Sequence, residues 1–265
     1  MGRLLAVLGA AAALAATPGS FLQAHRTPDG GYAESGSPAD PALTAWAVLG
    51  LRASGADAPG ALSYLQDRED ELAQTSDVAL AALAEEALGA RPANLLARLH
   101  ADERPTGAVG PTLNSTYWSV LALGEASKQT VRFIVAHQTA AGGFGWAVGG
   151  RADSNDTAAA LEALAVAGVH GATMTRAVRF LLSFQNRDGG FELTRGRGSD
   201  AQSTAWAIQG LFAAGRSPPR SAFAYLARLH REDGSYRYSA RYVTTPVWVT
   251  SQVLAALARR AFPLG

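Results

Sequence analysis

The chain has 265 residues, of which 48% are hydrophobic and 17% charged, so it is too apolar for a disordered protein and long enough for a large buried core. Its 23 basic and 22 acidic side chains give a formal net charge of +1, with no basic stripe to follow a phosphate backbone, and we expect no nucleic-acid partner. Cysteine is absent from the sequence, which excludes disulfides, thiol nucleophiles, thioesters and Cys-ligated zinc.

The N-terminus has the pattern of a cleaved secretion signal. Arg3 precedes an apolar run from Leu4 to Ala15, which is too short to cross a bilayer comfortably and ends in the small-x-small sequence A-L-A. We expect a signal peptide over residues 1–15, a mature domain over residues 16–265 and an extracytoplasmic location. The alternative interpretation of the run is a buried first helix in a cytoplasmic protein.

A repeated unit follows along the rest of the chain. Its clearest copy runs from Phe180 to Phe191 and contains Gln185 followed by an Asp-Gly-Gly sequence before the aromatic residue. Successive copies lie 31 to 47 residues apart, the range in which one repeat is one supersecondary unit. The glycine pairs at 142–143 and 189–190 are expected to include positive φ angles, which only Gly adopts cheaply. The copies begin at Phe21, Tyr64, Leu95, Phe133, Phe180 and Tyr225.

Each copy has a second half with helical periodicity. Apolar residues recur four and seven positions after a Thr near its start, and an Asp or Ser often precedes this Thr as a helix N-cap. No stretch alternates with a period of two for long enough to predict a sheet. Each unit is therefore a helix, a Gly-Gly loop and a second helix. The marker Thr of the second helix occurs five times, as Thr44, Thr116, Thr157, Thr204 and Thr250.

Six such units predict a closed ring. Six helical hairpins close an α/α toroid with inner and outer helix rings, whereas an open solenoid would need polar capping repeats at its ends. The last unit, from Val247 to Leu257, is as apolar as the middle ones, which favours closure. The predicted fold is therefore all-α, a single α/α toroid over residues 16–265.

The Q-x-x-D-G-G-aromatic loop, followed by a D/S-T-A-x-A-L helix, resembles the repeat of the prenyltransferase and squalene-cyclase superfamily. The resemblance covers essentially the whole mature chain and implies a terpene cyclase-like α/α toroid. In that family the loop Gln stacks on the aromatic residue and braces a helix end. The resemblance assigns this role to Gln138 and Gln185, with Arg26 and His230 at the equivalent places as departures.

One face of the second-half helices is a candidate ligand surface. The marker Thr and the apolar residues four and seven positions after it form the face that packs against neighbouring helices. Positions +2 and −2, counted from this Thr, lie on the opposite face, so in a toroid they line the central cavity. Tryptophans recur on this face and have two interpretations: they plug the axis of the ring, or they line a pocket for an apolar, flat or cationic ligand. The candidate ligand-binding residues are Trp46, Trp118, Trp206, Trp248, Asn114, Asn155, Gln202 and Gln252.

The usual signatures of catalysis and cofactor binding are missing. The five histidines form no H-x-x-x-H pair, no G-x-S-x-G elbow is present, and no glycine-rich phosphate loop opens a helix after a strand. The sequence therefore predicts neither a metal site nor a bound cofactor.

A possible acid is suggested only by the resemblance. Class II terpene cyclases protonate an alkene with the middle Asp of a D-x-D-D motif. The matching residues here are Asp153-Ser154-Asn155-Asp156, so an amide with no proton to give stands in place of the acid. Asp156 and Asp153 remain as candidate catalytic residues, since a buried Asp can stay protonated. The alternative is that both cap the helix that contains Thr157.

Two functions of different classes follow. The first is a secreted, non-catalytic toroid that binds a small hydrophobic ligand in a tryptophan-lined central cavity, as the cobalamin carriers of the superfamily bind theirs. The alternative is a class II terpene cyclase or isomerase of the squalene type, acting on an isoprenoid with Asp156 or Asp153 as acid. A protein- or glycan-binding scaffold is a third. The expected partner is a small hydrophobic or isoprenoid-like ligand, with no membrane span and only peripheral contact with a membrane.

Overall fold

The computed structural model describes residues 16–263. The predicted signal peptide lies outside these residues, and the limits of the mature domain stay a prediction. Within the described range the chain forms twelve α-helices, a short 3-10 turn and one pair of two-residue strands. The odd-numbered helices are α1 (Pro18–Ala24), α3 (Ala61–Gln66), α5 (Ala93–Ala101), α7 (Lys128–Ala136), α9 (Ala172–Leu182) and α11 (Arg220–Leu229). The even-numbered helices are α2 (Pro41–Ala53), α4 (Thr75–Ala87), α6 (Leu113–Leu123), α8 (Ser154–Val166), α10 (Ala201–Ala213) and α12 (Pro246–Leu257).

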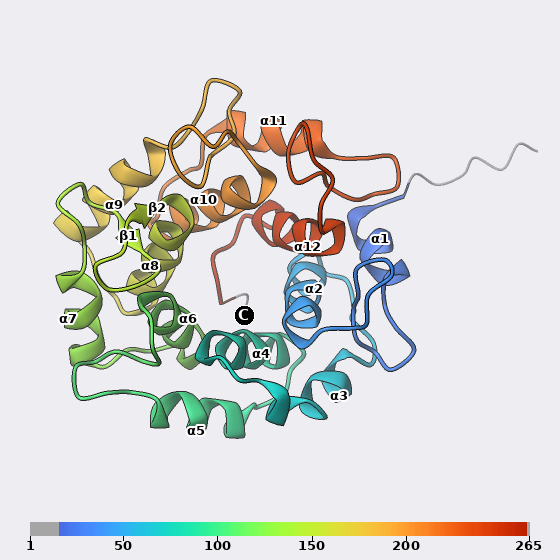
Figure 1. The fold of residues 1–265 in the computed structure, drawn as a ribbon, viewed down its shortest axis with the longest axis horizontal. Helices are drawn as coiled ribbons and strands as arrows, with labels where there is room; N and C mark the ends of the chain where they lie inside the picture. The colour runs from blue at the N-terminus through green and yellow to red at the C-terminus, as the bar shows by residue number, and fades with distance from the viewer. Residues whose placement is uncertain (1–15, 264–265) are drawn as a thin grey trace, which may run out of the picture.

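The helices alternate between two concentric rings (Figure 1). Each even-numbered helix packs against the even-numbered helices before and after it, and α12 packs against α2, so these six form a closed inner ring. The odd-numbered helices lie around it as an outer ring. The fold is thus the predicted all-α toroid of six helical hairpins. Within residues 16–263, no helix combines the length and the apolar character that a bilayer span requires.

A short antiparallel strand pair, which no period in the sequence predicts, lies in the loop before α8. β1 (Phe144–Gly145) pairs with β2 (Ala152–Asp153). The hairpin between them carries Trp146, whose carbonyl accepts the backbone N–H of Asn114 at 3.0 Å. This bond joins the hairpin to the start of α6.

The marker Thr of each repeat ties an inner helix to the loop before it. The hydroxyl of Thr157 accepts the backbone N–H of Phe144 at 3.0 Å and donates to the carbonyl of Asp153 at 2.6 Å. All five marker threonines accept an equivalent N–H at 2.9 to 3.1 Å, so the buried loop amides are satisfied. The five donors are Tyr32, Val109, Phe144, Phe191 and Tyr236.

The two glycines of a loop pair are required for different reasons. Gly142 and Gly189 have φ angles of 98° and 89°, as the sequence predicts, and a side chain at Gly189 would meet the backbone oxygen of Ser221 at 2.5 Å. Gly190 does not share the positive φ. It is restricted instead by the ring of Tyr225, which an added Cβ would approach to 2.8 Å.

The repeat glutamines join each loop to the next outer helix. Gln185 Nε2 donates to the hydroxyl of Ser221 in α11 at 2.9 Å, and Gln138 Nε2 donates to the carbonyl of Thr173 in α9 at 2.9 Å. Arg26 stands at the equivalent place in the first unit and donates to a carbonyl just before α3 at 3.1 Å. A longer cation thus makes the same connection as an amide.

Small residues let the inner helices approach closely. A Cβ on Gly50 of α2 would stand 2.5 Å from the backbone oxygen of Ser251 in α12, and one on Gly210 of α10 would stand 2.8 Å from Cα of Ala158 in α8. Both glycines come six positions after the marker Thr. The equivalent residues of the other inner helices are Ala84, Ala122, Ala163 and Ala256.

The first and last units meet at the N-terminus of α12. The carboxylate of Glu34 accepts the backbone N–H groups of Val247 at 3.1 Å and Trp248 at 2.9 Å. Thr245, the residue before the helix, provides no side-chain cap. The cap therefore comes from the loop between α1 and α2, and it fixes the closure of the ring.

The segment after α12 turns into the centre of the ring (Figure 1). Phe262 is buried there, with ring centroids 6.0 Å from Trp46 and 6.2 Å from Trp118. Its backbone N–H lies near the carboxyl of Glu162, a fully buried side chain of α8, and opposes the rise in the pKa of that carboxyl. The C-terminal segment therefore fills one end of the lumen.

Candidate functional site

A cavity of about 440 Å³ opens at the end of the ring where the inner helices begin. Every inner helix contributes to its lining, and the loops before α8 and α10 contribute as well. The structure places all ten sequence-predicted site residues around this one cavity. They are Trp46, Asn114, Trp118, Asp153, Asn155, Asp156, Gln202, Trp206, Trp248 and Gln252.

The helix period explains why these residues converge. Positions −2 and +2 of the inner helices lie one turn apart on the same face, so six parallel helices build two rings of side chains. The −2 ring is mostly polar and lies nearer the opening, while the +2 ring is mostly aromatic and lies deeper. The −2 ring consists of Ala42, Ser76, Asn114, Asn155, Gln202 and Trp248. The +2 residues that line the cavity are Trp46, Leu80, Trp118, Trp206 and Gln252.

The deeper tryptophans pack against one another and form the floor of the cavity. The ring centroids of Trp46 and Trp118 are 5.5 Å apart, and Trp206 lies 5.8 Å from Trp46 and 5.3 Å from Trp118. Phe262 packs against Trp46 and Trp118 in turn. In the structure the tryptophans close the axis of the ring and also line an open cavity.

Residues of α4 and of the strand hairpin complete the lining, and the sequence analysis missed them. Asp77 and Leu80 belong to a unit in which Val78 takes the place of the marker Thr, so its register is hidden in the sequence. Trp146 lies in the hairpin between β1 and β2 and is 59% exposed. Only its residue type could have indicated Trp146 as a site residue, because it is the one tryptophan of the chain outside the predicted helices.

The two aspartates of α8 play different parts. Asp153 is the N-cap, and its carboxylate accepts the backbone N–H of Asp156 at 2.8 Å. Asp156 does not cap the helix; it is buried at the cavity and accepts the side-chain N–H of Asn114 at 2.8 Å. The N-cap alternative is therefore right for Asp153 only.

Burial decides the protonation of this pair. It raises the pKa of both carboxyls, and the negative charge of Asp153 raises the pKa of Asp156 further, against the opposing effect of the Asn114 amide. Asp156 is thus the member of the pair that holds a proton. A protonated carboxyl at a cavity wall can donate a hydrogen bond to a ligand or act as a general acid.

Two polar side chains of the floor are without partners among the described residues. Gln252 is 1% exposed, and neither its amide oxygen nor its amide nitrogen makes a hydrogen bond there. The indole nitrogen of Trp206 is buried and unpaired in the same sense. Leaving such an atom unpaired costs about 1–3 kcal/mol, so the polar atoms of Gln252 and Trp206 would gain from a hydrogen-bonding partner in the cavity.

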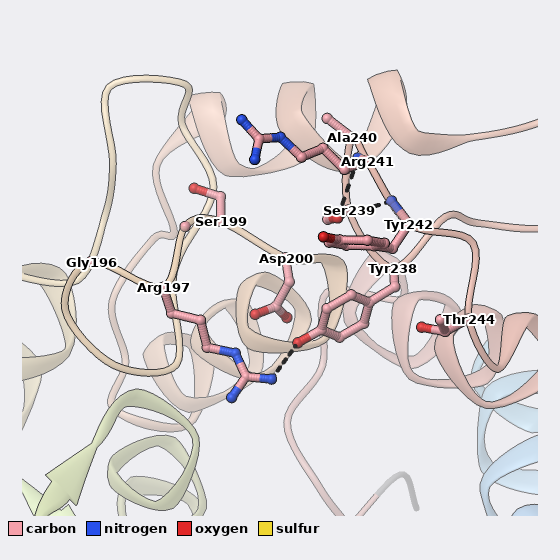
Figure 2. Close-up of a pocket in the computed structure, with 11 residues that line it drawn as sticks. Gly196, Arg197, Ser199, Asp200, Tyr238, Ser239, Ala240, Arg241, Tyr242 and Thr244 are labelled. Carbon is pink, nitrogen blue, oxygen red and sulfur yellow. Dashed lines mark hydrogen bonds between the residues drawn. The ribbon is translucent and has the colours of Figure 1, made fainter.

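A second, larger cleft lies outside the ring of inner helices. It has a volume of about 680 Å³ and separates the loop at 196–200 from the loop at 238–244 (Figure 2). Arg197 donates to the hydroxyl of Tyr238 across it at 3.4 Å, while Asp200 at its base is occupied as the N-cap of α10. No sequence-predicted site residue lines this cleft.

The sequence also matches a family model. The model of the prenyltransferase α/α-toroid domain matches residues 112–237, the stretch that carries both aspartates and the clearest copies of the repeat. The matched stretch is thus similar to the prenyltransferase α/α-toroid domain, and the described chain as a whole has the toroid fold. No curated protein matches its sequence.

Solved structures share the toroid at low sequence identity. A protein from Actinoplanes is 20% identical, with a TM-score of 0.67 over 91% of this chain and 97% of that one. A variant of the type II terpene cyclase MstE from Scytonema, in complex with its substrate geranylgeranyl dihydroxybenzoate, is 16% identical, with a TM-score of 0.66 over 91% and 94%. The ent-copalyl diphosphate synthase of Streptomyces platensis is 22% identical, with a TM-score of 0.59 over 83% and 50%. These likenesses establish the fold of the toroid.

Proposed function

We propose that the toroid binds a small hydrophobic ligand, isoprenoid-like in size, in its tryptophan-floored cavity and does not transform it. The observation that carries this proposal is the convergence of all five tryptophans of the chain on one cavity. The volume of about 440 Å³ falls in the range of small-molecule pockets. Aromatic walls with a few amides provide apolar contact area together with points that orient a ligand.

The non-catalytic role rests on Asn155. It lines the cavity at the place where the class II cyclase motif has its acid, and an amide has no titratable proton. The substrate named for the MstE complex carries a geranylgeranyl group, which supports an isoprenoid-like ligand for this toroid too.

The carboxyl of Asp156 supports a second candidate function. Asp156 is a buried, protonated carboxyl in the same cavity, as an acid that protonates an alkene must be. The second candidate is therefore a class II terpene cyclase in which Asp156 replaces the missing acid.

Binding and turnover are tested with the same variants. We expect geranylgeraniol to quench the tryptophan fluorescence of the wild type on binding, and Trp206→Ala to weaken that binding about 10-fold through loss of a buried aromatic contact. Phe133→Ala on the outer helix α7 is the control and should bind like the wild type. If neither geranylgeraniol nor any other small apolar probe changes the fluorescence, the binding function is wrong.

Turnover is measured by gas chromatography after incubation with squalene and with geranylgeranyl diphosphate. We expect no cyclic product from the wild type or from Asp156→Asn. Cyclic product from the wild type that is lost in Asp156→Asn, while ligand binding persists, would establish the cyclase instead.

We also propose that the protein is exported and loses residues 1–15. The support is the apolar run after Arg3. N-terminal sequencing of the protein from its own host should begin near Ala16, and a cytoplasmic protein that keeps the run would contradict export.

A further inference from the structure

The ionisable side chains around the cavity are all acidic. Within residues 16–263, sixteen residues line it, of which three are aspartates and none is Lys, Arg or His, although the chain has 23 basic residues and five histidines. The aspartates lie on two sides of the cavity, because Asp77 comes from α4 while Asp153 and Asp156 belong to the α8 side, with α6 between them. An anionic ligand would find no countercharge here.

Asp77 differs from the other two aspartates in its hydrogen bonding. Its half-buried carboxyl makes no hydrogen bond or ion pair within residues 16–263, whereas Asp153 caps α8 and Asp156 is held by Asn114. Burial raises its pKa, as does the negative charge of Asp40, so a positive group beside it would be stabilising.

The tryptophans form a box around this space. In the floor, Trp46 and Trp118 are 3% and 6% exposed and Trp206 is half-buried. Trp248 is half-buried on the wall, and Trp146 stands at the opening. Trp118 meets Trp46 at 86° and Trp206 at 88°, edge to face. All five tryptophans line the cavity, and the face of an indole ring attracts a cation through its quadrupole.

The dipoles of the inner helices do not cancel this attraction. All six begin at the opening, and their positive ends favour acidic groups in the first turn, which stabilises Asp77 and Asp153. In the first turn of α4 the carboxylate of Asp77 itself opposes that field, and the field falls off toward the floor tryptophans, which lie a turn deeper. Gln252, buried and unpartnered at the floor, adds an amide oxygen that accepts a hydrogen bond from an N–H cation or its hydration water.

We propose that the ligand of this cavity is an organic cation, with an alkylated ammonium group enclosed by the tryptophans beside Asp77 and an apolar body. This inference rests on the proposed binding function and adds the charge of the ligand to it. A neutral hydrocarbon would fill the space but leave Asp77 without a partner.

The test compares two probes of equal shape and different charge. Benzyltrimethylammonium and its carbon isostere neopentylbenzene are titrated into the full mature protein at low salt, and binding is followed by tryptophan fluorescence. We expect the cation to bind at least 10-fold more tightly than the isostere. We expect Asp77→Asn to reduce this ratio about 5-fold while the affinity for the isostere stays unchanged.

The control is Asp70→Asn, which removes the same charge from an exposed residue of the turn before α4. It should leave the ratio unchanged. An isostere that binds as tightly as the cation would overturn the inference and leave the binding function standing. If neither probe nor geranylgeraniol binds, the proposed function fails, and the inference fails with it.

Discussion

At the scale of single residues, the cavity separates two aspartates that are three positions apart. Asp153 is committed to the helix N-terminus, which needs a negative acceptor. Asp156 faces the cavity and is held by one donor, the amide of Asn114 on the neighbouring α6. Sequence alone could indicate both as caps or acids, but it could not assign the roles, because the donor lies 42 residues away.

Asn114→Ala should raise the pKa of Asp156 further. The Asn114 amide donates to the carboxylate and so favours its charged form; without it, burial and the negative charge of Asp153 act unopposed. Carbon-13 NMR of the aspartate carboxyls over a pH series measures the shift. Asn155→Ala is the matched control, since Asn155 lines the same cavity without bonding to Asp156, and it should leave this pKa nearly unchanged. A pKa of Asp156 that falls in Asn114→Ala would contradict the assignment.

At the scale of elements, the sequence predicts an inner helix best where the same side chain makes the same hydrogen bond in each unit. The marker threonines revealed five inner helices because each hydroxyl takes the same loop N–H. In α4, Val78 has no hydroxyl, and the contribution of that helix to the cavity was missed. Partners from distant parts of the chain, such as Glu34 on α12, leave no periodic signal at all.

The loop glycines allow backbone conformation and packing to be tested separately. Gly189 and Gly196 have φ angles of 89° and 84°, but a Cβ on Gly189 would stand 2.5 Å from the oxygen of Ser221, whereas one on Gly196 meets nothing within 4 Å. We expect Gly196→Ala to cost about 1 kcal/mol through the positive φ alone, and Gly189→Ala about 2–4 kcal/mol because it also displaces α11. Urea unfolding measures both. If both variants lose the same free energy of unfolding, the contact with α11 does not contribute to stability.

At the scale of the whole molecule, two contacts join the ends of the described chain to the middle of the ring. Glu34 caps α12 and so connects the first unit with the last. Phe262 packs against the floor tryptophans, with its backbone N–H near the carboxyl of Glu162. The floor of the cavity is therefore supported from below by the C-terminal segment, and the binding site depends on ring closure rather than on any single hairpin.

Glu162 should make the stability of the toroid fall as the pH rises. Complete burial raises its pKa from 4.5 to about 8, so the native protein keeps a proton that the unfolded chain releases near pH 4.5. The folded state then binds more protons than the unfolded state between these values, and the free energy of unfolding declines across that window by up to about 1.4 kcal/mol per pH unit. Below pH 4.5 this contribution is fully present, and above pH 8 it is lost.

Glu162→Gln removes the titration and keeps a side chain of nearly the same shape, with an oxygen that can face the N–H of Phe262. We expect its free energy of unfolding, from urea titrations at pH 5, 6, 7 and 8, to decline less steeply than that of the wild type, with a gain over the wild type that grows toward pH 8. The slope should not vanish, because burial also raises the pKa of Glu85, to about 7, and that of Asp156. Glu125→Gln changes an exposed carboxyl and should reproduce the wild-type slope. If the Glu162→Gln and wild-type curves run parallel, Glu162 is charged in the folded protein, and a cation or a water chain must reach it from the lumen.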